Sequence, residues 1–254
     1  MKIRFALAAL LVLTACKDPE PFDVARVKGS ELLKKNEFAA AAVEYEKSLE
    51  LKPDQDAKVW DRAAFANMKA GKLDRAAELL EKSIERRPDQ AARLETLRNI
   101  AGMYKEGQDL DGAEKYFQKA VALDPKDEQS LGWLAFISSA RGGAQSQAAT
   151  AQPEHLKIAL ERYDVLIALN PNKADAYVNK RIVLVKYIDF LTKQKLSILA
   201  DAEAQKKDKE AYDSAQEQAT DTQTRIDELK GLLDTTTVKL GEINKAAKAA
   251  AAAK

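Results

Sequence analysis

Few side chains in this sequence could do chemistry. The chain contains one histidine, His155, and Glu154 beside it could complete an acid–base pair or part of a metal site. A single imidazole without a cysteine or a second histidine nearby makes a poor zinc site, and adjacent residues on a helix point about 100° apart. The sequence also has no Gly-rich phosphate loop and no Gly-x-Ser-x-Gly elbow. We therefore expect His155 to be a surface residue and the protein to be no enzyme, with no metal and no cofactor.

The only cysteine, Cys16, ends the segment MKIRFALAALLVLTAC. Lys2 and Arg4 precede an apolar run, residues 5–14, that is too short to span a bilayer, so the segment is typical of a secretory signal. Its last four residues resemble the lipobox of bacterial lipoproteins. This resemblance implies cleavage before Cys16 and a diacylglycerol on the cysteine sulfur. The alternative is an ordinary signal peptide that happens to contain a cysteine. We expect a signal peptide over 1–15 and a lipidated tether over 16–21.

Removal of residues 1–15 would leave the charge close to neutral. The full sequence has 41 basic and 40 acidic residues, and losing Lys2 and Arg4 leaves 39 against 40, a net charge of −1. This balance argues against nucleic acid as a partner. Acyl chains contribute about 0.8 kcal/mol per buried methylene, so several chains would hold the protein at a membrane. Asp directly after the lipid-bearing cysteine resembles an inner-membrane retention signal, and Lys17 stands there instead. The analogy favours the outer membrane, facing the periplasm.

The elements that would position any functional residue are repeated pairs of amphipathic helices. In the second helix of each pair an alanine is followed four residues later by a bulky residue and twelve residues later by a proline. In the first helix a residue stands sixteen positions before that alanine, with a small residue four further on. The second-helix columns are Ala41, Ala76, Ala113 and Ala159, then Tyr45, Leu80, Phe117 and Tyr163, then Pro53, Pro88, Pro125 and Pro171. The first-helix columns are Ala25, Trp60 and Leu97, then Gly29, Ala64 and Ala101.

The segments NEFAAAAVEYEKSLELKPD and GKLDRAAELLEKSIERRPD closely resemble the second helix of the tetratricopeptide repeat, which has a period of about 34 residues. The resemblance covers about 22–190 and implies an all-α, TPR-type solenoid with hairpins at 22–55, 57–90, 94–127 and 128–173, and a partial one at 174–190. The alanine column has its own reason, because only a small side chain fits where two helices cross closely. The polar segment 142–152 is an insertion, either a tolerated flexible loop or a partner-contacting one.

The tail, 191–254, continues as long helices. Residues 212–250 place apolar or small side chains three and four residues apart without interruption, which is typical of a weak coiled-coil seam. Two arrangements fit. The helices could fold back as an antiparallel hairpin with a turn in 205–210, or one helix could pair with another chain, giving self-association through 208–250.

In the tetratricopeptide family the first helices line the concave face, with their second, fifth, ninth, twelfth and thirteenth positions pointing into it. Phe65, Met68 and Phe136 would be apolar anchors among basic neighbours, a mixture suited to an extended or helical peptide with some acidic residues. Alternatively, Phe65 and Phe136 are only interhelical core. Some members of the family hold a C-terminal carboxylate with a Lys and Asn set on the first two repeats and a Lys and Arg pair on the third. The corresponding positions here hold other residues, so we expect no such carboxylate clamp. They are Arg26, Ser30, Arg62, Glu95 and Asn99. The predicted groove residues are Arg26, Leu33, Lys34, Lys58, Asp61, Phe65, Met68, Lys69, Arg98, Lys105 and Phe136.

These features together predict a membrane-anchored binding module that acts as a scaffold for other proteins or peptides of the bacterial envelope. A narrower alternative is a pilotin-like assembly factor for an outer-membrane secretin of a pilus or secretion system. A third hypothesis is a structural spacer that oligomerises through its coiled-coil tail.

Overall fold

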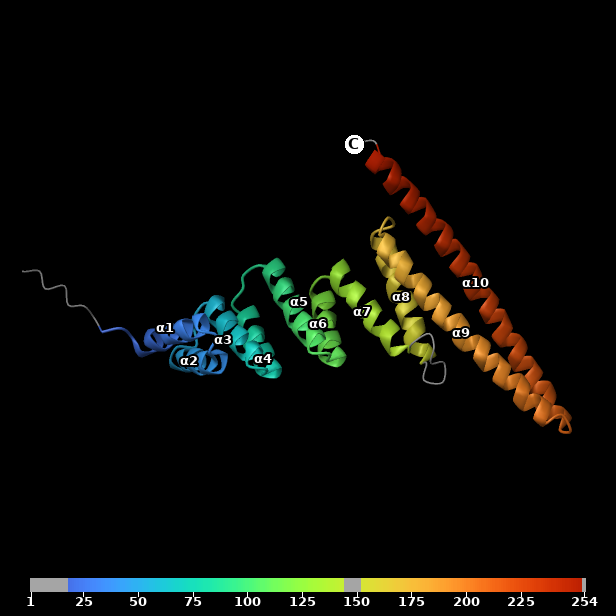
Figure 1. Ribbon diagram of the computed structural model, residues 1–254, viewed down its shortest axis with the longest axis horizontal. Coiled ribbons are helices and arrows are strands. Elements are labelled where there is room, and N and C mark those ends of the chain that lie inside the picture. The colour runs from blue at the N-terminus through green and yellow to red at the C-terminus, as the bar shows by residue number, and fades with distance from the viewer. Residues whose placement is uncertain (1–17, 144–151, 253–254) are drawn as a thin grey trace, which may run out of the picture. The chain divides into compact units, whose positions relative to one another are not determined.

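The computed structural model describes residues 18–143 and 152–252, and these residues form helices without strands. The chain divides into two compact units, residues 1–87 and 88–254, and each is described by itself. Unit 1 contains α1 (Pro21–Lys34), α2 (Phe38–Leu51), α3 (Ala57–Lys69) and α4 (Leu73–Ile84) (Figure 1). Unit 2 contains α5 (Gln90–Glu106), α6 (Leu110–Leu123), α7 (Glu128–Arg141), α8 (Pro153–Leu169), α9 (Ala174–Ala204) and α10 (Lys209–Ala252). The all-α, TPR-type fold is confirmed.

The helices pair as hairpins, α1 with α2, α3 with α4, α5 with α6 and α7 with α8. Two local features recur in successive hairpins, a capping aspartate and a left-handed turn residue. Aspartates cap the first helices α3, α5 and α7, as Asp56, Asp89 and Asp127 accept hydrogen bonds from the backbone N–H groups of Lys58, Ala92 and Ser130. A left-handed residue closes the turn after each first helix, with φ values of 60°, 79°, 62° and 91° at Asn36, Gly71, Gln108 and Gly143. In the first three hairpins these turns allow the second helix to reverse direction.

The alanine column lies where the hairpin helices cross. Ala41, Ala76, Ala113 and Ala159 are all 0% exposed, as the expected close crossing requires. The same crowding explains Gly29 on α1, because a Cβ atom there would lie 3.0 Å from the Tyr45 ring. Small residues at these positions therefore let the backbones approach, and the bulky residues of the next column fill the adjoining space.

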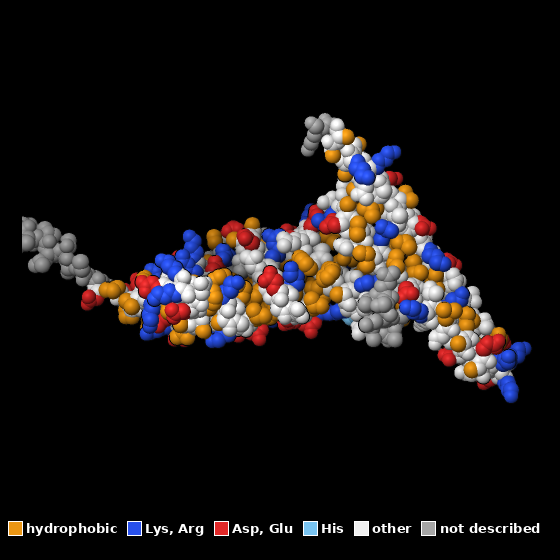
Figure 2. Space-filling view, viewed as in Figure 1, with side chains coloured by type: hydrophobic (Ala, Val, Ile, Leu, Met, Phe, Trp, Pro, Cys, Tyr) orange, Lys and Arg blue, Asp and Glu red, His pale blue; other side chains and the backbone are white. Residues whose placement is uncertain are grey.

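Ion pairs connect neighbouring helices of unit 2. Glu114 on α6 accepts hydrogen bonds from Arg141 on α7 and, at 3.3 Å, from Arg162 on α8. Arg162 also donates to the Leu134 carbonyl and the Ser138 hydroxyl at 2.7 and 2.6 Å. A single partly buried carboxylate thus joins three helices. Elsewhere, acidic and basic side chains are mixed over the visible face of each unit (Figure 2).

The tail adopts the antiparallel hairpin. α9 and α10 pack along each other (Figure 1), and the seam residues Ala219, Ile226, Leu229, Thr236 and Leu240 are buried. α9 runs without interruption from the partial repeat, 174–190, into the tail, because no glycine or proline interrupts 174–204. α10 has 44 residues against 31 in α9, so its C-terminal end extends past the start of α9 (Figure 1). No described helix is long and apolar enough to cross a membrane.

Candidate functional site

Large apolar side chains are exposed to solvent on two first helices of unit 2, α7 and α9. We call the exposed side of α5, α7 and α9 the first-helix face. Phe136 on α7 is 48% exposed, and Val178 and Ile182 on α9 are 41% and 46% exposed. Phe136 and Ile182 occupy equivalent positions, each nine residues after the N-cap residue of its helix, Asp127 or Lys173. Exposed large apolar side chains gathered on one face are informative, because single scattered ones are common on any protein surface.

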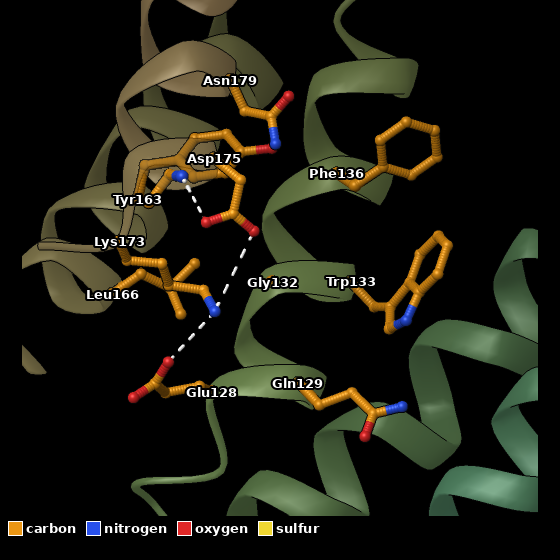
Figure 3. A pocket seen from close by; sticks show the side chains of 11 residues that line it. Glu128, Gln129, Gly132, Trp133, Phe136, Tyr163, Leu166, Lys173, Asp175 and Asn179 are labelled. Carbon is orange, nitrogen blue, oxygen red and sulfur yellow. Dashed lines mark hydrogen bonds and ion pairs between the residues drawn. The ribbon is translucent and has the colours of Figure 1, made fainter. Parts of the chain in front are cut away.

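A cavity of about 560 Å³ opens on this face between α7 and α9 (Figure 3). A Cβ atom on Gly132 would meet only Leu166 Cδ1, at 4.0 Å, so the glycine is not required by packing and leaves the cavity open. Clefts that bind small ligands or side chains generally have volumes of about 300–1,000 Å³. The lining residues are Glu128, Gln129, Gly132, Trp133 and Phe136 from α7, Tyr163 and Leu166 from α8, Lys173, and Asp175, Ala176 and Asn179 from α9.

Three charged groups surround the mouth of the cavity. Lys173 Nζ lies 3.1 Å from Glu128 Oε2 and 3.9 Å from Asp175 Oδ2, and the Asp175 side chain is 70% exposed. Burial, and secondly the negative charge of Asp175, raise the pKa of Tyr163 to about 12. Tyr163 therefore stays neutral at physiological pH, and Asp175 offers a carboxylate to solvent.

Aromatic rings lie on the side of α7 that faces away from Lys173 and Asp175 (Figure 3). Trp133 stacks on Phe117 with ring centroids 6.0 Å apart and meets Phe136 edge-on at 5.6 Å. The predicted groove residue Lys105 places its ammonium 4.1 Å from the Trp133 ring centroid. Arg98 donates to Asp127 Oδ1 at 3.2 Å and to Gln129 Oε1 at 3.1 Å. The structure thus brings Lys105 and Phe136 to one aromatic cluster, while the charge of Arg98 is matched by Asp127.

In unit 1, Phe65 and Lys69 lie together on α3. Phe65 is 44% exposed, meets Phe38 edge-on at 6.4 Å, and has the Lys69 ammonium 5.6 Å from its ring centroid. Asp61 already has hydrogen-bond partners within unit 1, because it accepts from Ser83 Oγ and Arg87 Nη2, each at 2.6 Å. It joins α3 to the end of α4 and is not a free groove side chain.

The remaining predicted residues of unit 1 lie on α1 and α3. Arg26 pairs with Asp23 one turn earlier. Leu33 and Met68 are half-buried, and Lys34 and Lys58 are exposed. Cys16, the expected lipidation site, lies outside the described residues, as does most of the insertion 142–152.

The prediction did not include several residues that build the cavity, among them Gly132, Tyr163, Asp175 and Asn179. Applying the same helix positions to the partial repeat 174–190 would have selected Asp175, Val178 and Ile182. The structure places His155 in a shallow depression beside Asp111, Glu114 and Arg141. Among the described residues, no group of three or more His, Cys, Asp or Glu side chains could hold a metal ion.

Comparisons with known proteins agree with this architecture. Models of the tetratricopeptide repeat match residues 27–55 and 55–126. No curated protein matches the sequence. A crystal structure of a TPR repeats protein from Bacteroides fragilis has a TM-score of 0.58 at 15% identity, over 90% of this chain and 98% of that one.

Two further solved structures are less similar. A tetratricopeptide repeat protein from Parabacteroides merdae has a TM-score of 0.41 at 14% identity, over 87% of this chain and 86% of that one. The pilF protein of Pseudomonas aeruginosa has a TM-score of 0.35 at 19% identity, over 78% and 90%. At sequence identities this low, structural similarity is evidence for the fold alone. Residues 27–126 therefore carry tetratricopeptide repeats, in an all-α fold of the TPR type whose members generally bind other proteins or peptides and are generally not enzymes.

Proposed function

We propose that this protein is a lipid-anchored scaffold of the bacterial cell envelope that holds partner proteins on the first-helix face of unit 2. The observation that carries the proposal is the open cavity between α7 and α9, with Phe136, Val178 and Ile182 exposed on the same face. Apolar side chains around a cleft gain free energy when a partner covers them. Aromatic anchors near the centre of an interface generally contribute most of its binding energy.

The polar groups on this face suit binding better than catalysis. Lys105 and Trp133 form a cation–π pair, and Lys173 is shared between two carboxylates. Asn179 adds an amide, which can both donate and accept a hydrogen bond. These groups can orient a bound segment, whereas none of them is arranged as a nucleophile with an adjacent base.

Membrane anchoring is the second part of the proposal and is supported by the sequence. Cys16 stands at the end of a secretory signal with lipobox-like residues before it, and α1 begins five residues later at Pro21. Such a tether can reach about 18 Å at most. Lys17 favours the outer membrane by analogy. The repeats would then present their binding face to periplasmic or membrane partners.

Site-specific photo-crosslinking tests the binding face. Benzoylphenylalanine at position 136 should give adducts with a defined set of envelope proteins in intact cells. The control position is Val238 on α10, which is 63% exposed and lies off the face. No adducts from position 136, or the same adducts from both positions, would contradict a role for this face.

Fatty-acid labelling tests the anchor. The wild-type chain should incorporate a labelled acyl group and fractionate with the outer membrane, and Cys16→Ser should lose the label and the membrane association. A wild-type chain without the labelled acyl group, or a Cys16→Ser protein that keeps it, would refute the lipid anchor while leaving the binding face untouched.

The spacer hypothesis gains no support from the arrangement of the tail. The seam residues of α10 from Ala219 to Leu240 already pack on α9. A second chain could use that seam only if the hairpin opened. We therefore expect the protein with Cys16→Ser to be monomeric at micromolar concentration by light scattering, and a stable elongated oligomer would favour the spacer.

A further inference from the structure

The mouth of the α7–α9 cavity carries a charge that does not suit the acidic ligand expected from the sequence. Glu128 and Asp175 share one cation, Lys173. Arg98 on α5, which reaches Gln129 of α7, forms an ion pair with Asp127 at 3.2 Å. Among the residues that line the cavity one negative charge is therefore left over, and the Asp175 side chain, 70% exposed, presents it to solvent.

Three other lysines of unit 2 have partners or positions away from this charge. Lys180 is paired with Asp164 at 2.5 Å. Lys186 donates to the Ser139 carbonyl at 3.1 Å and lies eleven residues after Asp175, about 16 Å along α9. That separation exceeds the screening length of about 8 Å at physiological ionic strength. Lys105 lies on the Trp133 ring, and Figure 3 shows Trp133 on the opposite side of α7 from Glu128, Lys173 and Asp175.

The cavity behind the mouth is apolar and has room for a side chain. Gly132 leaves open space, Leu166 and Ala176 contribute apolar atoms, and Tyr163 is held neutral. An apolar side chain fits this interior, and a lysine or arginine next to it has an apolar stem for the wall and a cationic head for the carboxylates. Arginine fits best, because its planar guanidinium can bind a carboxylate through two hydrogen bonds.

We infer that the cavity between α7 and α9 accepts a bulky apolar side chain of a partner segment whose adjacent lysine or arginine pairs with Asp175. This inference rests on the proposed function and specifies the chemistry of its partner. Glu128 and Asp175 also lie in the first turns of α7 and α9, where carboxylates stabilise a helix. A role confined to helix stability predicts less stable variants with unchanged binding, so binding measurements separate the two roles.

The test selects ligands from random dodecapeptides displayed on phage, with the full-length protein in mild detergent as the target. The selected peptides should be enriched in Lys or Arg beside Leu, Ile, Met or Phe. A synthetic copy of the most enriched peptide should bind Asp175→Lys about tenfold more weakly than wild type, by fluorescence anisotropy. Glu217→Lys is the matched control, because it makes the same charge change at an exposed position of α10 about 32 Å further along the hairpin.

Filling the cavity tests the apolar contact separately. Gly132→Met should weaken the binding of the same peptide at least tenfold. Gly231→Met should leave binding unchanged, because Gly231 is a helical glycine of α10 with no atom within 4 Å of its Cβ position. Circular dichroism checks the fold of each variant, and Asp175→Asn replaces Asp175→Lys if the latter unfolds.

The outcomes distinguish the inference from the proposed function. A consensus without basic residues, or full affinity in Asp175→Lys and Asp175→Asn, overturns the inference; loss of binding in Gly132→Met then still supports the face as a binding site. Failure to select any peptide that is sensitive to Gly132→Met contradicts both.

Discussion

Replacing Gly29 by alanine should destabilise unit 1, whereas the same replacement at Gly231 should stabilise unit 2. Both glycines are inside helices, where alanine is favoured over glycine by about 1 kcal/mol. At Gly231 no atom lies within 4 Å of the new Cβ, so the full gain should appear. At Gly29 the Cβ would lie 3.0–3.2 Å from three atoms of the Tyr45 ring, closer than the usual 3.5–4.0 Å for carbon contacts.

Tyr45 is 0% exposed, so its ring is enclosed by protein atoms on all sides. Overpacking of this kind costs about 1–3 kcal/mol, so Gly29→Ala should lose between 0 and about 2 kcal/mol after the helical gain is subtracted. Urea unfolding measures this, with Trp60 fluorescence in a Trp133→Phe background reporting unit 1 and circular dichroism reporting both units. Equal stabilisation by the two substitutions would refute the close approach of α1 to α2. Gly102→Ala on α5, also without a neighbour, is a second control.

Further predictions concern a turn, a tyrosine and an ion-pair network. Gln108→Gly should stabilise unit 2 by about 1 kcal/mol in urea, because Gln108 has φ of 62° and glycine adopts that conformation without strain. The pKa of Tyr163 is raised to about 12, so the unfolded tyrosine, with a pKa near 10, ionises first. The contribution of Tyr163 to the free energy of unfolding is therefore complete below about pH 10 and is lost as the pH rises toward 12, and in urea titrations Tyr163→Phe should reduce this loss. Glu114→Ala should cost about 2 kcal/mol, because it removes the carboxylate that two partly buried arginines share and leaves Arg141 with Asp111 alone; a loss below about 0.5 kcal/mol would mean that solvent replaces the carboxylate.

The first-helix face shows which properties of a residue its position in the repeat predicts and which it does not. Phe136 and Lys105 were selected by their positions in the repeat, and both lie at the Trp133 cluster. Asp61 was selected by the same rule, but it is held by Ser83 and Arg87. Repeat position determines which side of a helix a residue occupies. It does not determine whether a charged side chain finds a partner there, because that partner belongs to another helix.

The charge at the cavity mouth could not be read from the sequence. Glu128 is 45 residues before Lys173, and the two are separated by the insertion and by α8. Their 3.1 Å contact depends on α9 returning beside α7 after the hairpin has closed. The sequence therefore suggested a basic groove for acidic ligands, whereas the described structure leaves a negative charge next to an apolar cavity.

The sequence by itself determined the repeated hairpins, because small residues at helix crossings, bulky residues four positions later and prolines after each second helix specify local geometry and packing. Ala41, Ala76, Ala113 and Ala159 are accordingly all buried. Only the tertiary structure decided what covers the seam residues of α10, since the same residues could pack on α9 or on another chain. It also decided which exposed side chains meet around one cavity, because contacts between helices far apart in sequence depend on how the whole unit closes.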